Sequence, residues 1–181
     1  MKMSNKQRIL WITRTAIFTA LIIVMQAVTS VFGTTLITGS IVNLILIITV
    51  MTCGYASGLT VALISPVIAK LVGIGPLWEL IPFILIGNVT LVSVWHFLGN
   101  KKNWKPAVVS VTTLICAAVA KFLVLYVGIV LFAVPILLKL PAPQAAVVSN
   151  MFSIPQLFTA LVGGSLACIM LPTLKKAIVK G

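Results

Sequence analysis

Acidic side chains are almost absent from this sequence, which contains one Glu, Glu79, and no Asp. Histidine is equally scarce, with His96 alone. Carboxylate pairs, Ser-His-Asp sets and metal clusters all need residues that the chain does not supply in number. No Walker lysine motif is present for binding nucleotide phosphates. The sequence therefore predicts a protein that is not an enzyme, and any use of ATP is expected to come from another chain.

Charged residues of both signs make up only 8% of the 181 residues, whereas soluble domains average roughly 25%. Hydrophobic residues reach 61%, and the mean hydropathy is +1.24. A soluble domain of this length could not bury so much apolar surface. The net charge of +12 comes from Lys and Arg that gather at chain ends and loops, as membrane topology requires, and not in a basic stripe suited to nucleic acid.

Cysteines are few and isolated: Cys53, Cys116 and Cys168 each lie within an apolar run. An odd number of cysteines, without a CxxC motif or a nearby His, argues against a disulfide framework and against a zinc site. We therefore expect neither a metal nor a cofactor, and we interpret the cysteines as lipid-facing or packing residues.

Long apolar runs fill most of the chain, and breaks rich in Gly, Pro and polar residues separate them. A helix that crosses a bilayer needs about 20 apolar residues, or fewer where the membrane is thinned. The runs predict an all-α fold: a single membrane domain over residues 1–181, built as a bundle of transmembrane helices. The six expected spans cover approximately residues 9–32, 40–53, 59–72, 77–98, 106–132 and 145–171.

The distribution of basic residues decides between five and six spans. With six spans and the N-terminus inside, ten of the thirteen basic residues face the cytoplasm, and only Lys70 and Lys139 face outward. Merging the two short spans, 40–53 and 59–72, would place the basic loop 100–105 and the basic C-terminal tail on opposite sides, against the positive-inside rule. We therefore expect both ends of the chain in the cytoplasm and the protein in a prokaryotic cell membrane.

Polar residues inside the spans are the candidates for function. A rise of about 1.5 Å per residue places Asn43, Glu79, Lys121 and Gln156 in the outer half of the membrane, and Asn88 nearer the midplane. Ionisable groups at such depth are costly and face a cavity or a partner. Glu79 and Lys121 either form a structural ion pair or face a ligand.

For each of the other candidates, a purely structural role is an alternative to ligand binding. Lys70 either snorkels to the outer interface or binds ligand, and the amides either bridge helices or line a site. Trp78 and Tyr126 either stack on a flat ligand or serve as belt and packing residues. The bias of the polar groups toward the outer half favours a solute pocket that opens outside. The loop 73–76 and the turn 34–40 are its expected lid.

Small residues at a spacing of four, such as Ala16 and Ala20, permit close approach between helices. Together with six short-looped spans in about 180 residues and basic ends, they resemble the substrate-binding S component of an energy-coupling factor (ECF) transporter. The stretches 38–43 and 62–88, with their Ser65-Pro66, Gly73-Ile74-Gly75-Pro76 and Gly87-Asn88, are similar to the vitamin-type S components. The resemblance covers nearly the whole chain.

The resemblance implies a transport subunit that binds a vitamin or related micronutrient in the outer half of the membrane. It implies that Ala16 and Ala20 face a transmembrane coupling subunit, and that two cytoplasmic ATPase subunits drive import. The chain departs from the nickel and cobalt members because it begins Met1-Lys2-Met3 without an early His, which argues against a metal substrate.

The vitamin itself is left open by the sequence. Several amides and few charges slightly favour cobalamin, while pantothenate, pyridoxine-type compounds and queuosine precursors are alternatives. Two other functions are also considered: a small self-assembling channel, which would need polar residues through both leaflets, and a membrane-embedded enzyme, which would need catalytic groups.

Overall fold

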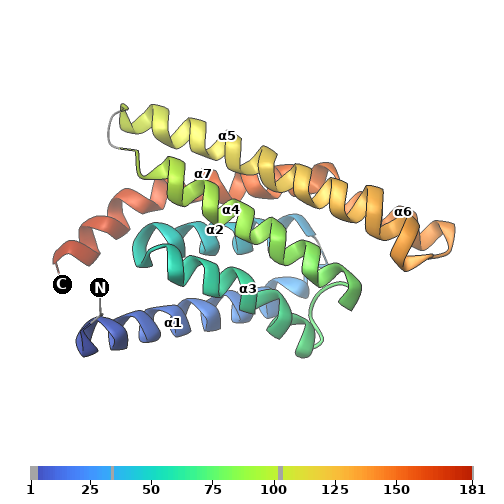
Figure 1. The fold of residues 1–181 in the computed structure, drawn as a ribbon, viewed down its shortest axis with the longest axis horizontal. Helices are drawn as coiled ribbons and strands as arrows, with labels where there is room; N and C mark the ends of the chain where they lie inside the picture. The colour runs from blue at the N-terminus through green and yellow to red at the C-terminus, as the bar shows by residue number, and fades with distance from the viewer. Residues whose placement is uncertain (1–3, 34, 102–103, 181) are drawn as a thin grey trace.

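The computed structural model describes residues 4–33, 35–101 and 104–180, with side chains described as far as Lys176. Within these ranges the chain is helical apart from short connections, and Figure 1 shows the helices lying side by side in one bundle. The main helices are α1 (Asn5–Ser30), α2 (Thr35–Cys53), α3 (Tyr55–Leu71), α4 (Ile81–Gly99), α5 (Pro106–Leu125), α6 (Ala142–Met151) and α7 (Ile154–Lys180). A 3₁₀ turn, η1 (Trp78–Leu80), precedes α4, and a π-helix, η2 (Tyr126–Leu138), continues α5.

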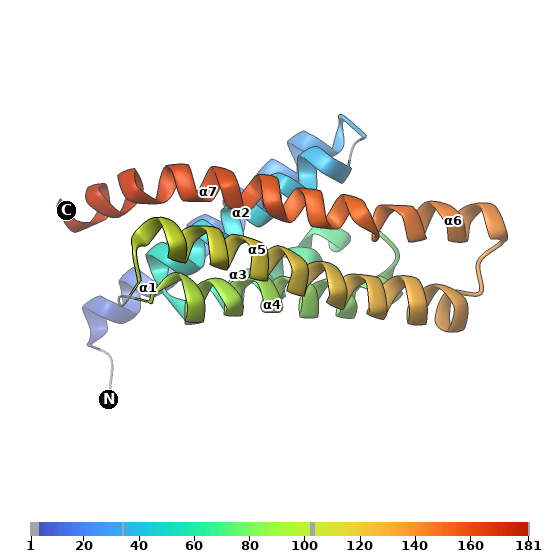
Figure 2. The same ribbon diagram turned by 90° about the horizontal axis from the view of Figure 1, so that it is seen from above.

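Five helical stretches of the described chain are long and apolar enough to cross a membrane, and α3 is a shorter apolar helix. The predicted all-α class and the membrane character are thus confirmed, while the number of crossings and their orientation stay predictions. Figures 1 and 2 show both termini at the same end of the bundle, which we call the terminal end. The opposite end, which carries α6, is the distal end.

Several helix boundaries differ from the predicted ones. The expected turn 34–40 is wrong over its described part, because α2 begins at Thr35; Thr34 lies outside the described residues. The predicted span 106–132 runs on as η2 to Leu138, and the predicted span 145–171 is two helices that are interrupted at 152–153. Polar Thr, Gly and Ser residues suggested a turn, yet threonine hydroxyls can bond to helix carbonyls and remain within a helix.

Local sequence signals account for the main helix ends. Ser4 and Gln7 form a capping box at the start of α1. Gly54, with φ of 89°, separates α2 from α3, in a conformation that residues with a Cβ rarely adopt. Proline stands in the first turn of α4 and at the first position of α5, where its missing N–H leaves no hydrogen bond unmade.

The terminal half of the bundle is closed and apolar. Its core includes Leu46 of α2, Val61 of α3, Leu91 and Trp95 of α4, and Ala167 of α7, each no more than 2% exposed. These residues come from four helices and belong to one apolar cluster. Side-chain packing of this kind holds helices together in lipid, where no hydrophobic force acts between them.

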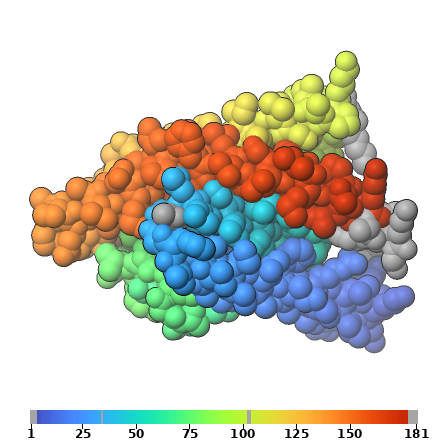
Figure 3. Space-filling view, turned by 180° about the vertical axis from the view of Figure 1, so that it is seen from behind, coloured from blue at the N-terminus to red at the C-terminus, as the bar shows by residue number. Residues whose placement is uncertain are grey.

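The distal end is drawn out into a hairpin formed by η2 and α6. Figures 2 and 3 show this hairpin projecting beyond α1, α2 and α3. The continuous stretch Pro106–Leu138 has 33 residues. At about 1.5 Å per residue it spans roughly 50 Å, more than the ~30 Å of a bilayer's hydrocarbon core. A second apolar cluster, which includes Leu125, Ile129 and Phe152, joins the hairpin to the bundle.

Candidate functional site

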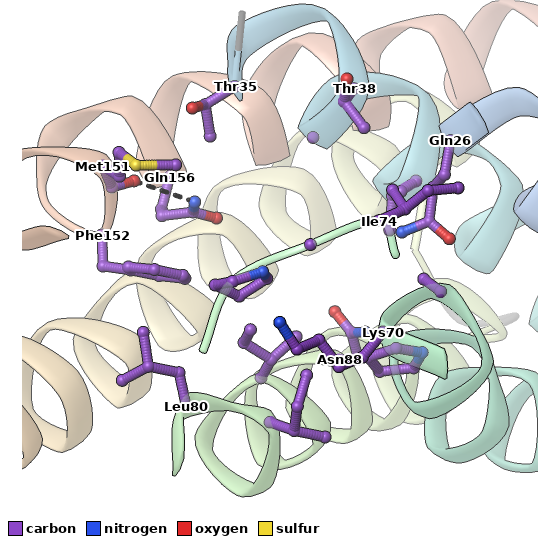
Figure 4. Close-up of a pocket in the computed structure, with 18 of the residues that line it drawn as sticks. Gln26, Thr35, Thr38, Lys70, Ile74, Leu80, Asn88, Met151, Phe152 and Gln156 are labelled. Carbon is purple, nitrogen blue, oxygen red and sulfur yellow. Dashed lines mark hydrogen bonds between the residues drawn. The ribbon is translucent and has the colours of Figure 1, made fainter. Parts of the chain in front are cut away.

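A cavity of about 530 Å³ lies within the distal half of the bundle. Its volume is in the range of pockets that hold small organic molecules, roughly 300–1,000 Å³. Figure 4 shows side chains from several helices surrounding the space, with Phe152 and Gln156 on one side and Gln26 and Ile74 on the other. The polar and charged residues that line it are Gln26, Ser30, Thr35, Thr38, Asn43, Ser65, Lys70, Asn88, Lys121 and Gln156.

Lys121 of α5 forms the centre of a buried polar cluster at the wall of this cavity. Its Nζ donates to Asn43 Oδ1 of α2 at 2.6 Å and to Asn88 Oδ1 of α4 at 2.7 Å. All three side chains are at least 96% buried. Because an ammonium group only donates, both amides must present their oxygens to it, which fixes their orientation. The cluster therefore ties three helices together at one level.

Helix α7 extends the cluster from the other side. Asn43 Nδ2 donates to Thr159 Oγ1 at 3.3 Å, and that hydroxyl donates to the Gln156 carbonyl oxygen at 2.9 Å. The helices approach closely because Gly163 of α7 faces α2, and a Cβ there would collide with the Ser40 carbonyl oxygen. Because α7 has a glycine at this position, the Asn43 side chain can donate to Thr159 through Nδ2 and accept from Lys121 through Oδ1.

The break between α6 and α7 lies beside the cavity. Gln156 Nε2 donates to the Met151 carbonyl oxygen at 3.0 Å and so bridges the two helices across the break. Figure 4 draws this hydrogen bond as a dashed line. The same interruption turns Phe152, which is 6% exposed, into the cavity wall. The interruption therefore adds one polar and one aromatic surface to the site.

Two segments cover the cavity at its distal side. The connection after α3 contributes Ile74, Gly75 and Pro76, and Gly73 and Gly75 have φ of 81° and 106°. Only glycine adopts such angles without strain, so the chain can fold back over the opening. The other segment consists of the end of α1 and the first turns of α2. Its part in α2 was expected as the turn 34–40 and is helical from Thr35 onward.

Five of the eight predicted substrate-binding residues line the cavity: Asn43, Lys70, Asn88, Lys121 and Gln156. Three do not. Trp78 is 51% exposed in η1, and Tyr126 stacks on Phe122 with ring centroids 5.6 Å apart.

Glu79, the third, is exposed in the 3₁₀ turn and is not among the cavity-lining residues. The hypothesis of an ion pair between Glu79 and Lys121 is not supported by their contacts, since Lys121 instead donates to two asparagines. Glu79 lies in η1, just before α4, and its side chain points away from the interior of the bundle.

Gln26 of α1 was missed as a site residue. Its side chain lines the cavity, and its Oε1 is buried without a hydrogen-bond partner in the described structure. The available signal was an amide within an otherwise apolar part of the span 9–32, which is the same signal that identified Asn43 and Asn88. Ser65 and Thr38 also line the cavity, but hydroxyls are too common in membrane helices to be distinctive.

The predicted partner-binding residues lie on a different face of the molecule. Ala16 and Ala20 are exposed on α1. This is the least buried of the long helices, because only 11% of an apolar 18-residue segment of it is buried inside the bundle. They are therefore available for contact with lipid or with another protein.

His96, the one histidine of the sequence, does not line the cavity. It stacks on Tyr55 with ring centroids 4.6 Å apart.

Comparison with known proteins identifies no relative. No family model matches the chain, and neither the curated proteins nor the solved structures contain a significant match. The fold and the cavity therefore have to be interpreted from their own chemistry. They establish a helical membrane protein with a buried Lys-Asn-Asn cluster beside a cavity.

Proposed function

We propose that this protein is the substrate-binding S component of an ECF-type importer in a prokaryotic cell membrane. In this role it captures a vitamin or related micronutrient from outside the cell. ATP hydrolysis is supplied by two cytoplasmic ATPase subunits, and a transmembrane coupling subunit connects them to this chain. The proposal places the terminal end in the cytoplasm and the cavity in the outer half of the membrane.

The observation that carries the proposal is the cavity of about 530 Å³ with a buried cation and amides in its wall. Burying a charged group in a membrane protein is costly, so such a group usually marks a site for a ligand, a transport pathway or a partner. Here they adjoin a space of the right size for a small solute. The position of the cavity, remote from both termini, agrees with uptake from the outer face.

The two alternative functions fit the bundle less well. A channel needs a wet path through both leaflets, but the terminal half is filled by an apolar core that includes Leu46, Leu91 and Trp95. An enzyme needs acids, bases or a metal. No cluster of three or more His, Cys, Asp or Glu side chains that could hold a metal occurs in the described part of the chain. A solute-binding subunit needs neither.

The volume of the cavity bears on which substrate is bound. Pockets of a few hundred Å³ suit compact organic molecules. Cobalamin, a corrin ring with an attached nucleotide, is much larger than such a space. Smaller micronutrients, of the size of pantothenate or pyridoxine, are therefore the better candidates.

The exposed face of α1 is the proposed contact with the coupling subunit. Ala16 and Ala20 leave room for a neighbouring helix to approach closely, and neither is needed for the packing of the bundle. This assignment follows the resemblance to S components. It explains how a helix can remain on the outside of the molecule without contributing to the cavity beyond its last turns.

The proposal is tested by native mass spectrometry of the protein purified in mild detergent from cells grown in rich medium. We expect one small molecule to be retained per protein and to be lost after substitution of Asn43 by Leu. The matched control is Asn100→Leu, which changes an exposed amide outside the cavity. A protein that retains no small molecule, and whose melting temperature no bacterial metabolite extract raises, would contradict the proposal.

The orientation is tested separately by labelling single cysteines with a membrane-impermeant maleimide. Pro141, in the distal hairpin loop, is expected to react from outside intact cells. Asn100, at the terminal end of α4, is expected to react only after the membrane has been opened. The reverse pattern would place the cavity in the cytoplasmic half and exclude uptake from outside.

A further inference from the structure

The cavity wall carries positive charge that no acidic residue balances. Lys121 and Lys70 both line the cavity, and Glu79, the only acidic residue of the chain, does not. An ammonium group that is removed from water without a counterion is strongly unfavourable. The asparagine oxygens that contact Lys121 are dipoles, and they solvate its charge without neutralising it.

The cluster also has spare hydrogen-bond donors rather than spare acceptors. A lysine ammonium has three N–H groups, and two of those on Lys121 are taken by Asn43 and Asn88. The Asn88 oxygen is used by Lys121, while its Nδ2 has no hydrogen-bond partner in the described structure and is not among the fully enclosed polar atoms. Within this cluster, one ammonium N–H and a neighbouring amide N–H₂ remain for a ligand.

Apolar side chains line another part of the same cavity. Ile84 of α4, Leu125 of α5 and Phe152 after α6 line the same space. A ligand that fits must therefore combine a compact acceptor group of negative charge with an apolar body. A carboxylate fulfils the first condition, because its two oxygens accept from adjacent donors and its charge pairs with an ammonium.

We propose that the cavity binds an amphipathic organic carboxylate, with the carboxylate at Lys121 and Asn88 and the apolar body against Ile84, Leu125 and Phe152. This inference rests on the proposed function, since it names the chemical class of the substrate. It replaces the expectation of cobalamin, which rested on the several amides and few charges of the chain. The same chemistry would recognise a water-soluble acid or a fatty acid from the bilayer, so the two sources need separate tests.

The probe is a polar metabolite extract from bacteria, separated by ion exchange into anionic, neutral and cationic fractions. A second sample of the anionic fraction has its carboxyl groups converted to methyl amides. Oleate serves as the lipid-derived arm. Each is added to the detergent-solubilised protein, and the melting temperature is recorded as a function of concentration.

Three variants accompany the natural sequence. Lys121→Met removes the cation, and Lys175→Met is its control because Lys175 is exposed outside the cavity. Asn88→Asp keeps the size of the side chain but places a carboxylate beside Lys121, where it occupies the cation permanently. Asn88→Asp is informative even if Lys121→Met does not fold, because the new ion pair holds α4 to α5.

We expect the anionic fraction to raise the melting temperature of the natural protein and of Lys175→Met, and the amidated fraction to have no effect. Lys121→Met and Asn88→Asp should need at least about tenfold more of the anionic fraction for the same shift, a loss of roughly 1.4 kcal/mol. Stabilisation by the neutral or cationic fraction, or an undiminished response of Asn88→Asp, would overturn the carboxylate inference and leave the proposed function standing.

Two further outcomes separate the inference from the proposed function. Stabilisation by oleate alone would support a carboxylate site but overturn the proposal of solute uptake. Failure of every fraction and of oleate to stabilise the natural protein would overturn both.

Discussion

The two halves of the bundle are built from the same helices, yet one half is solid and the other is hollow. In the terminal half, Leu46 of α2 and Leu91 of α4 are fully buried in the same apolar core. In the distal half, Asn43 and Asn88, each three residues earlier on the same two helices, turn to Lys121 beside a cavity. Less than one helical turn thus separates a residue of the packed core from a residue of the cavity wall on each helix.

The comparison teaches how a small membrane protein can hold a costly cavity. Lipid cannot drive helices together, so close packing and hydrogen bonds must do so. The terminal half supplies the packing, and the distal half supplies hydrogen bonds from one cation to two helices. The cation that binds the ligand in our proposal is therefore also the group that holds the cavity wall in place.

The contact between α2 and α7 supports both halves, and its disruption is expected to have the largest effect. Gly163→Leu would force a side chain against the Ser40 carbonyl oxygen and separate Asn43 from Thr159. We expect destabilisation of about 3 kcal/mol or more, beyond the ordinary cost of overpacking, because backbone is struck and a buried hydrogen bond is lost. Thermal unfolding in detergent measures the effect. Gly33→Leu would not serve as a control, because Gly33 has a positive φ and a side chain there would strain the backbone.

A better control for Gly163→Leu is Leu166→Ala, which changes an exposed residue one turn away on α7. Its melting temperature should remain close to that of the natural protein. A Gly163→Leu variant that is equally stable would mean that α2 and α7 are not in close contact.

Truncations of matched size in the two halves are expected to separate stability from binding. Leu46→Ala opens a hole in a packed core and should cost about 2 kcal/mol, near the lower end of the range for soluble proteins, because lipid is itself apolar. Ile84→Ala removes atoms that already face the cavity and should cost less than about 1 kcal/mol.

Ligand affinity should show the opposite order for these two truncations. Ile84→Ala removes apolar contact with the ligand body, whereas Leu46 lies outside the cavity lining. Titration of both variants with the retained solute provides the measurement. Equal losses of affinity would show that the two halves do not act separately.

The smallest effect on the isolated protein is expected on the outer face of α1. Replacing Ala16 and Ala20 by Trp adds bulk to exposed positions and should change neither the melting temperature nor solute affinity appreciably. ATP-dependent uptake in cells that supply the coupling subunit and the ATPases should nevertheless be lost, because the helices can no longer approach closely. Loss of solute binding in the isolated variant would show that this face packs within the bundle.

Sequence analysis identified five of the ten polar and charged residues that line the cavity, but not their pairing. Asn43, Asn88 and Lys121 stood out because an amide or an ammonium within an apolar run is costly wherever it points. Gln26 carried the same signal and was overlooked, and Glu79 was assigned to the membrane interior although it lies in an exposed 3₁₀ turn. The difference arises at helix ends, where one turn of uncertainty in a boundary decides whether a side chain faces the interior of the bundle or its exterior.

The sequence by itself determined that this protein is helical and membrane-embedded, because composition and run length fix the solvent that a chain requires. Through the constant rise of the helix, it also set the approximate position of each polar residue along its helix. Only the tertiary structure decided which side chains meet, since the rotation of each helix about its axis follows from packing with its neighbours. That rotation turned Lys121 toward two asparagines and left Glu79 exposed at the bundle's edge.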